Sequence, residues 1–459
     1  MELEAESRFL TTCELANRRD WKHRILEMEK MAKLDLMQKS RVKWLCDGDE
    51  NSRFFHCYLK AKNRRSNING LMVNGNWVTD CAAIKLETWR FFGDKFHETC
   101  TSRPPLISDK FRMLSDCDRQ FLEAPFDIRG IRESIWNCGG DKAPAPDGFT
   151  FNFIKRYWDF MQDDIMRFVK HFEEFGSFSR GSNSSFISLL PKVKDPLTLA
   201  EFRPISLIGC VYKIIAKSLA SRIKRVIGSV IDESQTAFIQ GRNILDGPMI
   251  INEVCVWARK DKCKSFLFKV DFEKAFDSIN WNYLDSTMRQ MGFGDKWRFW
   301  IRGCLSSSWT SVLINGSTSK EFPITKGVRQ RDPLSPFLFI IAMEGLKVAM
   351  KSACQLSLFN GIDLPNLSPS ISHMFYSDDV MFMGKWSNSN FVNLARILRC
   401  FHASSGLKVN FHKSKVYGIG VSKTEIARCA RILGCEAASF PFKYLGIPVG
   451  VNMSLKRNW

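Results

Sequence analysis

Three aspartates lie where carboxylates could hold a metal ion. Asp271 follows the apolar run Ser265–Val270, and the adjacent pair Asp378 and Asp379 interrupts a second apolar stretch, residues 371–383. Carboxylates with strongly apolar flanks are costly to desolvate unless a cation compensates their charge. Their oxygens are hard ligands that suit Mg²⁺, and no His or Cys cluster offers a softer site. The pattern favours a divalent-metal site.

Such a site would suit phosphoryl transfer. Transfer from a nucleoside triphosphate requires charge neutralisation on the leaving phosphates and an activated 3′-hydroxyl, and two divalent ions close together supply both. Plainer interpretations stay open when each residue is taken singly. Asp271 could cap a helix, because helix formers follow it as far as Asp277, and adjacent acids are common in turns.

This chemistry requires elements that bring the carboxylates together. Ser265–Val270 is predicted to be a buried strand that ends at Asp271, and Ile371–Met383 a tight hairpin with the two acids at its tip. A third segment, Gly327–Pro336, precedes a predicted apolar helix, Phe337–Met350. Its Pro and Ser residues mark a helix start whose amide dipoles would favour a phosphate, although a capped helix alone would look the same.

The remaining chain alternates short apolar strands with helices, which predicts an α+β or α/β fold. The elements expected are a hairpin over Ile68–Thr79 turning at Asn74-Gly75, a rigid loop at Lys142–Gly148, a helix over Phe151–Phe172, a strand at Phe186–Leu190 and a helix over Tyr212–Ile227.

The N-terminal 65 residues are dense in charge, with apolar residues at helical steps, which predicts a long amphipathic helix. Within this region, Gln38–Arg65 is basic and carries Trp44, Phe54, Phe55 and Tyr58. Such a segment could follow a phosphate backbone while its aromatics stack on bases. A solvated helix face is the alternative interpretation.

The composition is that of a globular protein with a polyanionic partner. Of 459 residues, 67 are Lys or Arg and 48 are Asp or Glu, which gives a net charge of +19 and suits nucleic acid or an anionic membrane surface. The 15 cysteines are scattered without a Cys-x-x-Cys pair, which argues against a disulfide framework and indicates a reducing compartment. Neither a membrane span nor a secretion signal is expected.

Ordered motifs along the chain resemble the reverse transcriptase of non-LTR (LINE-type) retrotransposons, with plant elements the nearest match. The matching segments, in order, are residues 38–56, Lys142–Phe149, Glu201–Leu207, Gln235–Gly241, Asn243–Asp246, Asp271–Asp277, Gly327–Pro336, Tyr376–Asp379, Gly406–Lys415 and Tyr444–Gly446. The resemblance implies an α+β right-hand polymerase with fingers, palm and partial thumb that makes DNA on an RNA template with Mg²⁺, or with Mn²⁺ in its place. The implied partners are an RNA template, a DNA primer and deoxynucleoside triphosphates.

The resemblance also implies roles for individual residues. Asp271, Asp378 and Asp379 match the catalytic, metal-binding carboxylates. The implied substrate-binding residues are Arg203 near the triphosphate, Phe276 as the residue that excludes a 2′-hydroxyl, Gln330 facing nucleotide or template, and either Lys413 or Lys415 as the palm lysine that protonates pyrophosphate. For Arg203 and the two lysines, a surface ion pair is the plainer alternative.

Three positions depart from the family pattern. Arg331 stands where the family has Gly after the motif's Gln, and if that position needs a positive φ the replacement costs about 1–2 kcal/mol. Ala145 replaces a Gly in the Lys-Ala-Pro loop, which is a milder form of the same problem. Ser377 replaces Ala before the Asp pair and is nearly isosteric.

The resemblance further predicts the organisation of the chain. The expected parts are a helical basic N-terminal segment at 1–65, an N-terminal extension and the start of the fingers at 66–185, fingers and palm at 186–440, and the start of a thumb at 441–459, with truncation at both ends. Nuclear action is expected of the family. Two alternatives to an active polymerase remain: a catalytically inactive nucleic-acid-binding relic, and an RNA-binding cofactor of the maturase type.

Overall fold

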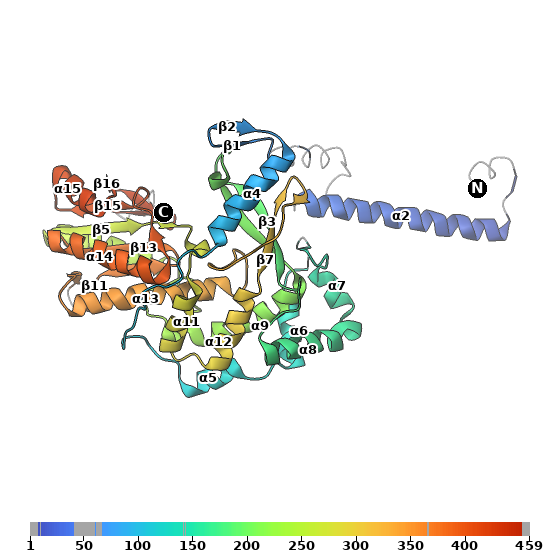
Figure 1. Ribbon diagram of the computed structural model, residues 1–459, viewed down its shortest axis with the longest axis horizontal. Helices are drawn as coiled ribbons and strands as arrows, with labels where there is room; N and C mark the ends of the chain where they lie inside the picture. The colour runs from blue at the N-terminus through green and yellow to red at the C-terminus, as the bar shows by residue number, and fades with distance from the viewer. Residues whose placement is uncertain are drawn as a thin grey trace. The chain divides into compact units, whose positions relative to one another are not determined.

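The computed structural model (Figure 1) describes residues 8–9, 11–40, 60, 67–140, 142, 144–364 and 367–451. They form a mixture of helices and sheets, which confirms the predicted α+β class. The chain divides into two compact units. The first comprises Met1–Asp80, Leu190–Arg203 and Ile314–Gly316, and the second comprises Cys81–Leu189, Pro204–Leu313 and Ser317–Trp459. The boundaries predicted at residues 65, 185 and 440 were based on the order of sequence motifs, whereas the two units are defined by compactness. The predicted boundaries therefore stay predictions.

The first unit contains the predicted hairpin, formed by β1 (Leu71–Val73) and β2 (Asn76–Val78). Asn74 and Gly75 join the strands with φ values of 49° and 82°. Two successive residues with positive φ make a type I′ turn, whose twist matches that of the flanking strands. The hairpin predicted from Asn74-Gly75 is therefore confirmed.

The first unit also contains the long helix α2 (Thr12–Ser40). The helix itself was predicted, but its amphipathic character is not confirmed. Its apolar side chains, such as Trp21 and Met28, are mostly exposed and do not gather on one face. The predicted nucleic-acid segment, Gln38–Arg65, lies outside the described residues except for its first three residues and Lys60.

Helices make up most of the second unit. Within the described ranges they are α4 (Cys81–Phe96), α5 (Asp116–Glu123), α6 (Ile128–Trp136), α7 (Phe151–Arg156), α8 (Trp158–Phe175), α9 (Cys210–Val230), α10 (Asp246–Lys260), α11 (Trp281–Gln290), α12 (Asp295–Ser306), α13 (Ser335–Gln355), α14 (Asn388–Ser405) and α15 (Lys423–Leu433). The helix predicted over Phe151–Phe172 is two helices that meet at Tyr157. None of the helices in the described ranges combines the length and apolar character that a membrane crossing requires.

Two five-stranded sheets accompany these helices. One has the order β12 (His373–Tyr376), β13 (Asp379–Lys385), β5 (Ser265–Val270), β15 (Lys415–Ile419) and β16 (Glu436–Ala438). The other contains β4 (Phe202–Ile208), β3 (Ser184–Pro191), β7 (Trp309–Ile314) and β8 (Ser317–Thr318) in that order, with β9 (Phe322–Pro323) also paired to β7. The two-stranded pairs are β6 (Phe272–Glu273) with β14 (Lys408–Val409), β10 (Ile362–Leu364) with β11 (Leu367–Ile371), and β17 (Phe442–Tyr444) with β18 (Ile447–Val449).

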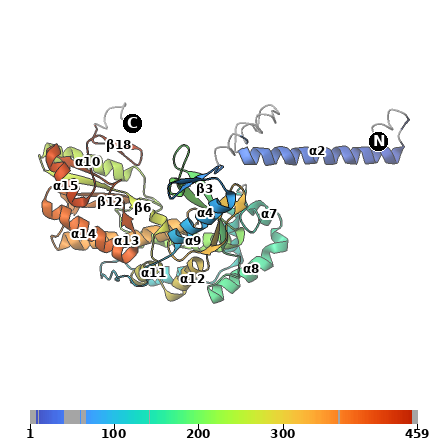
Figure 2. The same cartoon turned by 45° about the horizontal axis from the view of Figure 1, so that its top comes forward.

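The sheet centred on β5 is buried on both faces, which explains the unbroken apolar run that predicted the strand. Successive side chains of a strand point to opposite faces. Phe266 and Phe268 accordingly join the core shared with α13 and α14, and Leu267 joins the cluster formed with α10. Figure 2 shows α10 and α14 on opposite sides of this sheet.

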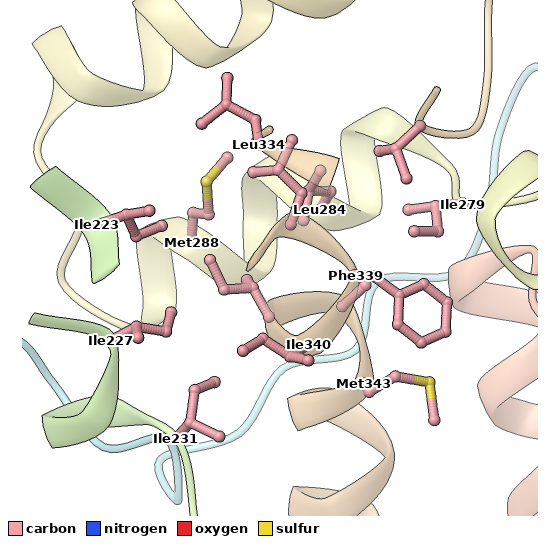
Figure 3. Close-up of a cluster of buried hydrophobic side chains, with 14 of the residues drawn as sticks. Ile223, Ile227, Ile231, Ile279, Leu284, Met288, Leu334, Phe339, Ile340 and Met343 are labelled. Atoms are coloured by element: carbon pink, nitrogen blue, oxygen red, sulfur yellow. The ribbon is translucent and has the colours of Figure 1, made fainter. Parts of the chain in front are cut away.

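The largest core lies where α9, α11 and α13 pack together (Figure 3). Ile223 and Ile227 of α9, Leu284 of α11, and Phe339 and Ile340 of α13 are fully buried. Each pair on one helix occupies the spacing that places side chains on a common or adjoining face. Burying a side chain of this size contributes about 1.5–3 kcal/mol, so this junction fixes α13 beneath the loops that bear the candidate site.

Candidate active site

Asp271 directly follows β5, the central strand of the first sheet. Its backbone N–H donates to Ser414 Oγ at 3.1 Å, and its carbonyl oxygen accepts from the Asn410 N–H at 2.8 Å. Both partners belong to the turn that precedes β15. The backbone of Asp271 is therefore held on the side away from β13, and its position is determined by three neighbouring chain segments.

The helix predicted to begin at Asp271 is absent. Phe272–Glu273 forms β6, paired with β14, and the 3₁₀ helix η3 (Ala275–Asp277) follows. The first α-helix after the strand is α11, and its cap is Asn280, whose Oδ1 accepts from the Tyr283 N–H at 2.9 Å. Asp271 caps no helix, so the capping interpretation is wrong.

The predicted hairpin is formed by β12 and β13 and places a second carboxylate beside the first. Tyr376 pairs with Asp379, so the turn consists of Ser377-Asp378, and Asp379 belongs to the strand rather than to the tip. On the other edge of β13, Val380 lies opposite Val270. The ladder ends there, and Asp379 and Asp271 are the next residues of the two chain segments, at the same end of the sheet. Neighbouring strands of a sheet lie about 4.7–4.9 Å apart.

The three carboxylates repel one another. Burial raises the pKa of Asp271; the charges of Asp378 and Glu273 raise it further, while those of Lys413 and Lys269 lower it. Burial also raises the pKa of Asp379, followed by the charges of Asp378 and Asp271, with Lys269 opposing. Asp271 and Asp379 are thus costly to ionise, first because they are partly buried and then because other acids are close.

Within the described ranges, no lysine or arginine closes an ion pair with Asp271, Asp378 or Asp379. In the same ranges, no three His, Cys, Asp or Glu side chains are grouped tightly enough to hold a metal ion as they stand. The donor chemistry nevertheless suits a divalent cation, since hard carboxylate oxygens carry uncompensated charge in a partly buried place. Binding would require the side chains to turn toward a common point.

Gln235 supports the turn that bears Asp378. Its fully buried side chain accepts the Ser377 N–H on Oε1 at 2.9 Å. The same segment forms a parallel bridge with β12, where the Thr236 N–H donates to the Phe375 carbonyl oxygen at 3.0 Å. Ser377 has a φ of 57°, a left-handed conformation that a non-glycine residue adopts only at a cost. The amide of Gln235 compensates part of this cost.

Ser377 also carries an unpaired hydroxyl. Among the described atoms, neither Ser377 Oγ nor Gln235 Nε2 has a hydrogen-bond partner, although both are buried. A buried polar atom without a partner costs about 1–3 kcal/mol. The polarity of the Ser377 hydroxyl is therefore not neutral for the fold.

The Gly327–Pro336 segment is joined to the residues that follow Asp271. The Phe276 ring stacks on Phe339 of α13, with centroids 4.5 Å apart and an interplanar angle of 13°. The Phe276 carbonyl oxygen accepts from the Val328 N–H at 2.7 Å. Gln330 Nε2 donates to Asp277 Oδ1 at 3.3 Å. The structure therefore brings two of the predicted substrate-binding residues, Phe276 and Gln330, into one connected group.

Arg331 has the positive φ that was expected to cause backbone strain at this position. Its φ is 79°, in the left-handed region, and its side chain is exposed. Ala145 differs, because it is not among the described residues with positive φ, whereas Gly148 is, with φ 70°. Backbone strain of this kind therefore applies to Arg331 and not to Ala145.

The two candidate lysines have different surroundings. Lys413 is exposed in the turn beside Asp271 and its charge lowers the pKa of that carboxyl. Lys415 lies in β15, and its Nζ is 3.2 Å from Glu436 Oε2. The plainer interpretation, a surface ion pair, therefore describes Lys415. Arg203 belongs to the first compact unit, where its side chain is exposed on β4, and its proximity to triphosphate stays a prediction.

A buried ion pair also joins α4 to the group that contains Gln330. Lys95 of α4 lies 2.8 Å from Asp277, measured from Nζ to Oδ2, and both side chains are over nine-tenths buried. Nothing in the sequence singles out this lysine, apart from Phe92 and Phe96 at spacings that place aromatics beside it.

Comparison with known proteins agrees with this geometry. Residues 190–449 match the family model described as reverse transcriptase (RNA-dependent DNA polymerase). A protein of transposon TX1 from Xenopus laevis, described as an uncharacterized 149 kDa protein, is 28% identical over 442 residues, which is 95% of this chain and 33% of that protein. The Pol polyprotein of the type-2 retrotransposable element R2DM from Drosophila melanogaster is 26% identical over 331 residues, covering 72% of this chain and 29% of that protein.

A mitochondrial protein of Arabidopsis thaliana, described as uncharacterized, is 34% identical over 113 residues, or 24% of this chain and 88% of that protein. The chain spans about a third of the length of the two retroelement relatives. The family model covers more than half of the chain, including all three candidate carboxylates. The chain therefore belongs to the reverse transcriptase (RNA-dependent DNA polymerase) family and, with its retroelement relatives, to the non-LTR retrotransposon type.

Proposed function

We propose that this chain is an RNA-directed DNA polymerase, in which Asp271, Asp378 and Asp379 hold two Mg²⁺ ions. The observation that supports the proposal is the strand register. Val380 pairs with Val270, so the adjoining residues Asp379 and Asp271 lie at the same end of the two strands, and no lysine or arginine of the described ranges forms an ion pair with either. When bound, such ions would neutralise the triphosphate and activate the primer 3′-hydroxyl. Mn²⁺, which accepts the same oxygen ligands, is the alternative ion.

The remaining residues would bind and select the substrates. Phe276, held flat against Phe339, would exclude a ribose 2′-hydroxyl by its bulk. Gln330 would face the nucleotide or template, and Arg203 the triphosphate. Lys413 is the better candidate for the pyrophosphate-protonating lysine, because Lys415 is engaged by Glu436. The substrates proposed are an RNA template, a DNA primer and deoxynucleoside triphosphates, with the fingers, palm and thumb arranged as a right hand and action in the nucleus.

The opposing proposal is a nucleic-acid-binding relic without turnover. The left-handed backbone at Arg331 favours it, since a long cation there replaces the glycine of the family and carries conformational strain. The two proposals predict the same affinity for nucleic acid and different chemistry, so incorporation is the quantity that separates them.

The experiment is primer extension on an RNA template by the purified chain across a Mg²⁺ titration, repeated with Mn²⁺. Three variants accompany it: Asp378→Ala, Arg331→Gly, and Asp363→Ala as a matched control, because Asp363 is an exposed acid of the same unit that pairs with Lys385. The polymerase proposal predicts metal-dependent incorporation that Asp378→Ala abolishes and Asp363→Ala leaves intact. Retained RNA binding with no incorporation by either the unaltered chain or Arg331→Gly would overturn it in favour of the relic.

A further inference from the structure

The buried contact between α4 and Asp277 connects a distant helix to the proposed nucleotide-selecting residues. Lys95 and Asp277 form an ion pair 2.8 Å long, with side chains only 8% and 4% exposed. Asp277 uses its two oxygens differently: Oδ2 faces Lys95, and Oδ1 accepts the Gln330 side-chain amide at 3.3 Å. One carboxylate therefore links α4 to Gln330.

Asp277 directly follows Phe276, so the same carboxylate is adjacent to the proposed 2′-hydroxyl filter. The two loops are joined by further bonds on either side of it. The Gly327 N–H donates to the Ile279 carbonyl oxygen at 2.7 Å, and the Val328 N–H donates to that of Phe276 at 2.7 Å. Residues 276–279 and 327–330 therefore form one unit that is anchored through Asp277.

The chain after α4 reinforces the anchor. The Phe96 carbonyl oxygen accepts from the Thr325 N–H at 3.0 Å, and the Glu98 N–H donates to Thr325 Oγ1 at 2.7 Å. Glu98 Oε2 in turn accepts from Asn280 Nδ2 at 2.9 Å. The end of α4 and the residues after it thus contact Thr325 and Asn280, which flank the two loops. Lys95 forms the ion pair with Asp277, and the charge of Lys274 also acts on this carboxylate.

A buried carboxylate is tolerated when a cation and hydrogen bonds satisfy it, and breaking such a pair leaves an uncompensated charge. Without Lys95, the oxygens of Asp277 would have to find other donors or reach water, and the Gln330 amide would lose its fixed partner. A shift of the Asp277 side chain would first move Gln330 and Phe276, because they are the neighbours of Asp277 that are proposed to face the substrate.

We propose that Lys95 is a positioning residue for nucleotide selection, acting through Asp277 on Gln330 and Phe276. This inference rests on the polymerase function proposed above. It assigns to α4 a role in choosing deoxynucleotides over ribonucleotides, without contact between Lys95 and the substrate.

The test measures KM and kcat for a deoxynucleotide, and the preference for it over the matching ribonucleotide, in Lys95→Met and Lys95→Arg. Lys85→Met is the matched control, since Lys85 lies on the same helix away from Asp277. Lys95→Met is expected to raise KM by roughly tenfold or more and to narrow the preference, with a smaller change in kcat, because small displacements of substrate-positioning groups have effects of this size. The KM, kcat and deoxynucleotide preference of Lys95→Arg and Lys85→Met are expected to stay close to those of the unaltered chain.

The double variant Lys95→Met/Asp277→Asn removes both charges and keeps an amide that can bond Gln330. Its KM is expected to lie between those of Lys95→Met and the unaltered chain, and its deoxynucleotide preference is expected to be partly restored. If Lys95→Met alone does not fold, the double variant is measured in its place. A folded Lys95→Met variant with unchanged KM and unchanged deoxynucleotide preference would overturn the proposal. A double variant whose KM and preference are no closer to those of the unaltered chain than those of Lys95→Met would overturn it as well.

If neither the unaltered chain nor Arg331→Gly incorporates nucleotide, the polymerase proposal fails, and the positioning role of Lys95 is judged separately. Backbone hydrogen exchange at Gly327 and Val328 reports directly on the bonds between the two loops. Faster exchange there in Lys95→Met, and not in Lys85→Met, would support the positioning role; unchanged exchange would refute it.

Discussion

Replacing Arg331 with glycine is expected to stabilise the fold. Arg331 has a φ of 79°, where the side chain of an L-residue crowds the backbone, and its own side chain is exposed. Holding a non-glycine residue in the left-handed region costs about 1–2 kcal/mol. Glycine removes that cost but loses about 0.5–1 kcal/mol through its greater freedom in the unfolded chain. The net gain is therefore between about 0 and 1.5 kcal/mol, with a central value of roughly 0.8 kcal/mol.

Comparison with Arg331→Ala isolates the backbone contribution. Alanine removes the same guanidinium and keeps the left-handed strain, so it should differ from arginine by no more than about 0.5 kcal/mol. Glycine should then exceed alanine by about 1 kcal/mol. In urea, with a slope of about 3 kcal/mol per molar, this corresponds to a midpoint higher by roughly 0.3 M.

The assay is equilibrium urea unfolding of the three chains, followed by far-UV circular dichroism, with the slopes compared as well as the midpoints. Equal slopes are needed for the midpoints to report stability alone. A glycine variant no more stable than the alanine variant would show that residue 331 is not confined to the left-handed region, and the strain account of Arg331 would then be wrong.

Four other substitutions have defined outcomes. Ser377→Ala should raise the free energy of unfolding by about 1 kcal/mol in the same urea assay, because it removes a buried hydroxyl without a partner; a loss would show that the hydroxyl is bonded. Asp379→Asn should abolish incorporation yet stabilise the chain at neutral pH. Since burial and neighbouring acids raise the pKa of Asp379, the folded state holds the proton more tightly, and stability falls as pH rises from the ordinary value of 3.8 through the raised one. The melting temperatures of the unaltered chain and Asp379→Asn should therefore converge at pH values below this range. Melting temperatures that differ by the same amount at every pH would contradict a raised pKa for Asp379. Gly303→Ala should cost about 2–3 kcal/mol, because the added methyl would overlap the Gly176 carbonyl oxygen, whereas Gly93→Ala, with open space in α4, should gain about 0.5–1 kcal/mol; equal melting temperatures for the two would refute the close approach at Gly303.

The strongly patterned elements were predictable from sequence. The run Ser265–Val270 is apolar on both faces because β5 is buried between two helical layers, and its predicted bounds match the strand. The hairpin at Asn74-Gly75 follows from a dipeptide that is strongly preferred where two successive residues have positive φ. The helix after Pro336 was likewise expected from its start signal and appears as α13. These features depend on neighbours in sequence.

The failures arose where distant partners decide the structure. Residues after Asp271 have helix-forming character, but Phe272–Glu273 pairs with β14, which lies far along the chain, and the helix is displaced to α11. The support given by Gln235 to Ser377 spans 142 residues, and no local pattern announces it. In the sequence, Lys95 cannot be distinguished from other helical lysines, and only the fold shows that it contacts Asp277.

The bond between the Asp271 N–H and Ser414 Oγ joins residues 143 positions apart, and it has a consequence for how the protein is made. Ribosomes add roughly 5–20 residues per second, so Asp271 leaves the ribosome about 7–30 seconds before its partner. Until β13 (Asp379–Lys385) has been synthesised, which is most of this interval, β5 lacks both neighbouring strands and exposes an apolar segment on two faces. Nascent chains of this protein should therefore depend on chaperones that shield Ser265–Val270 until the flanking strands have been synthesised.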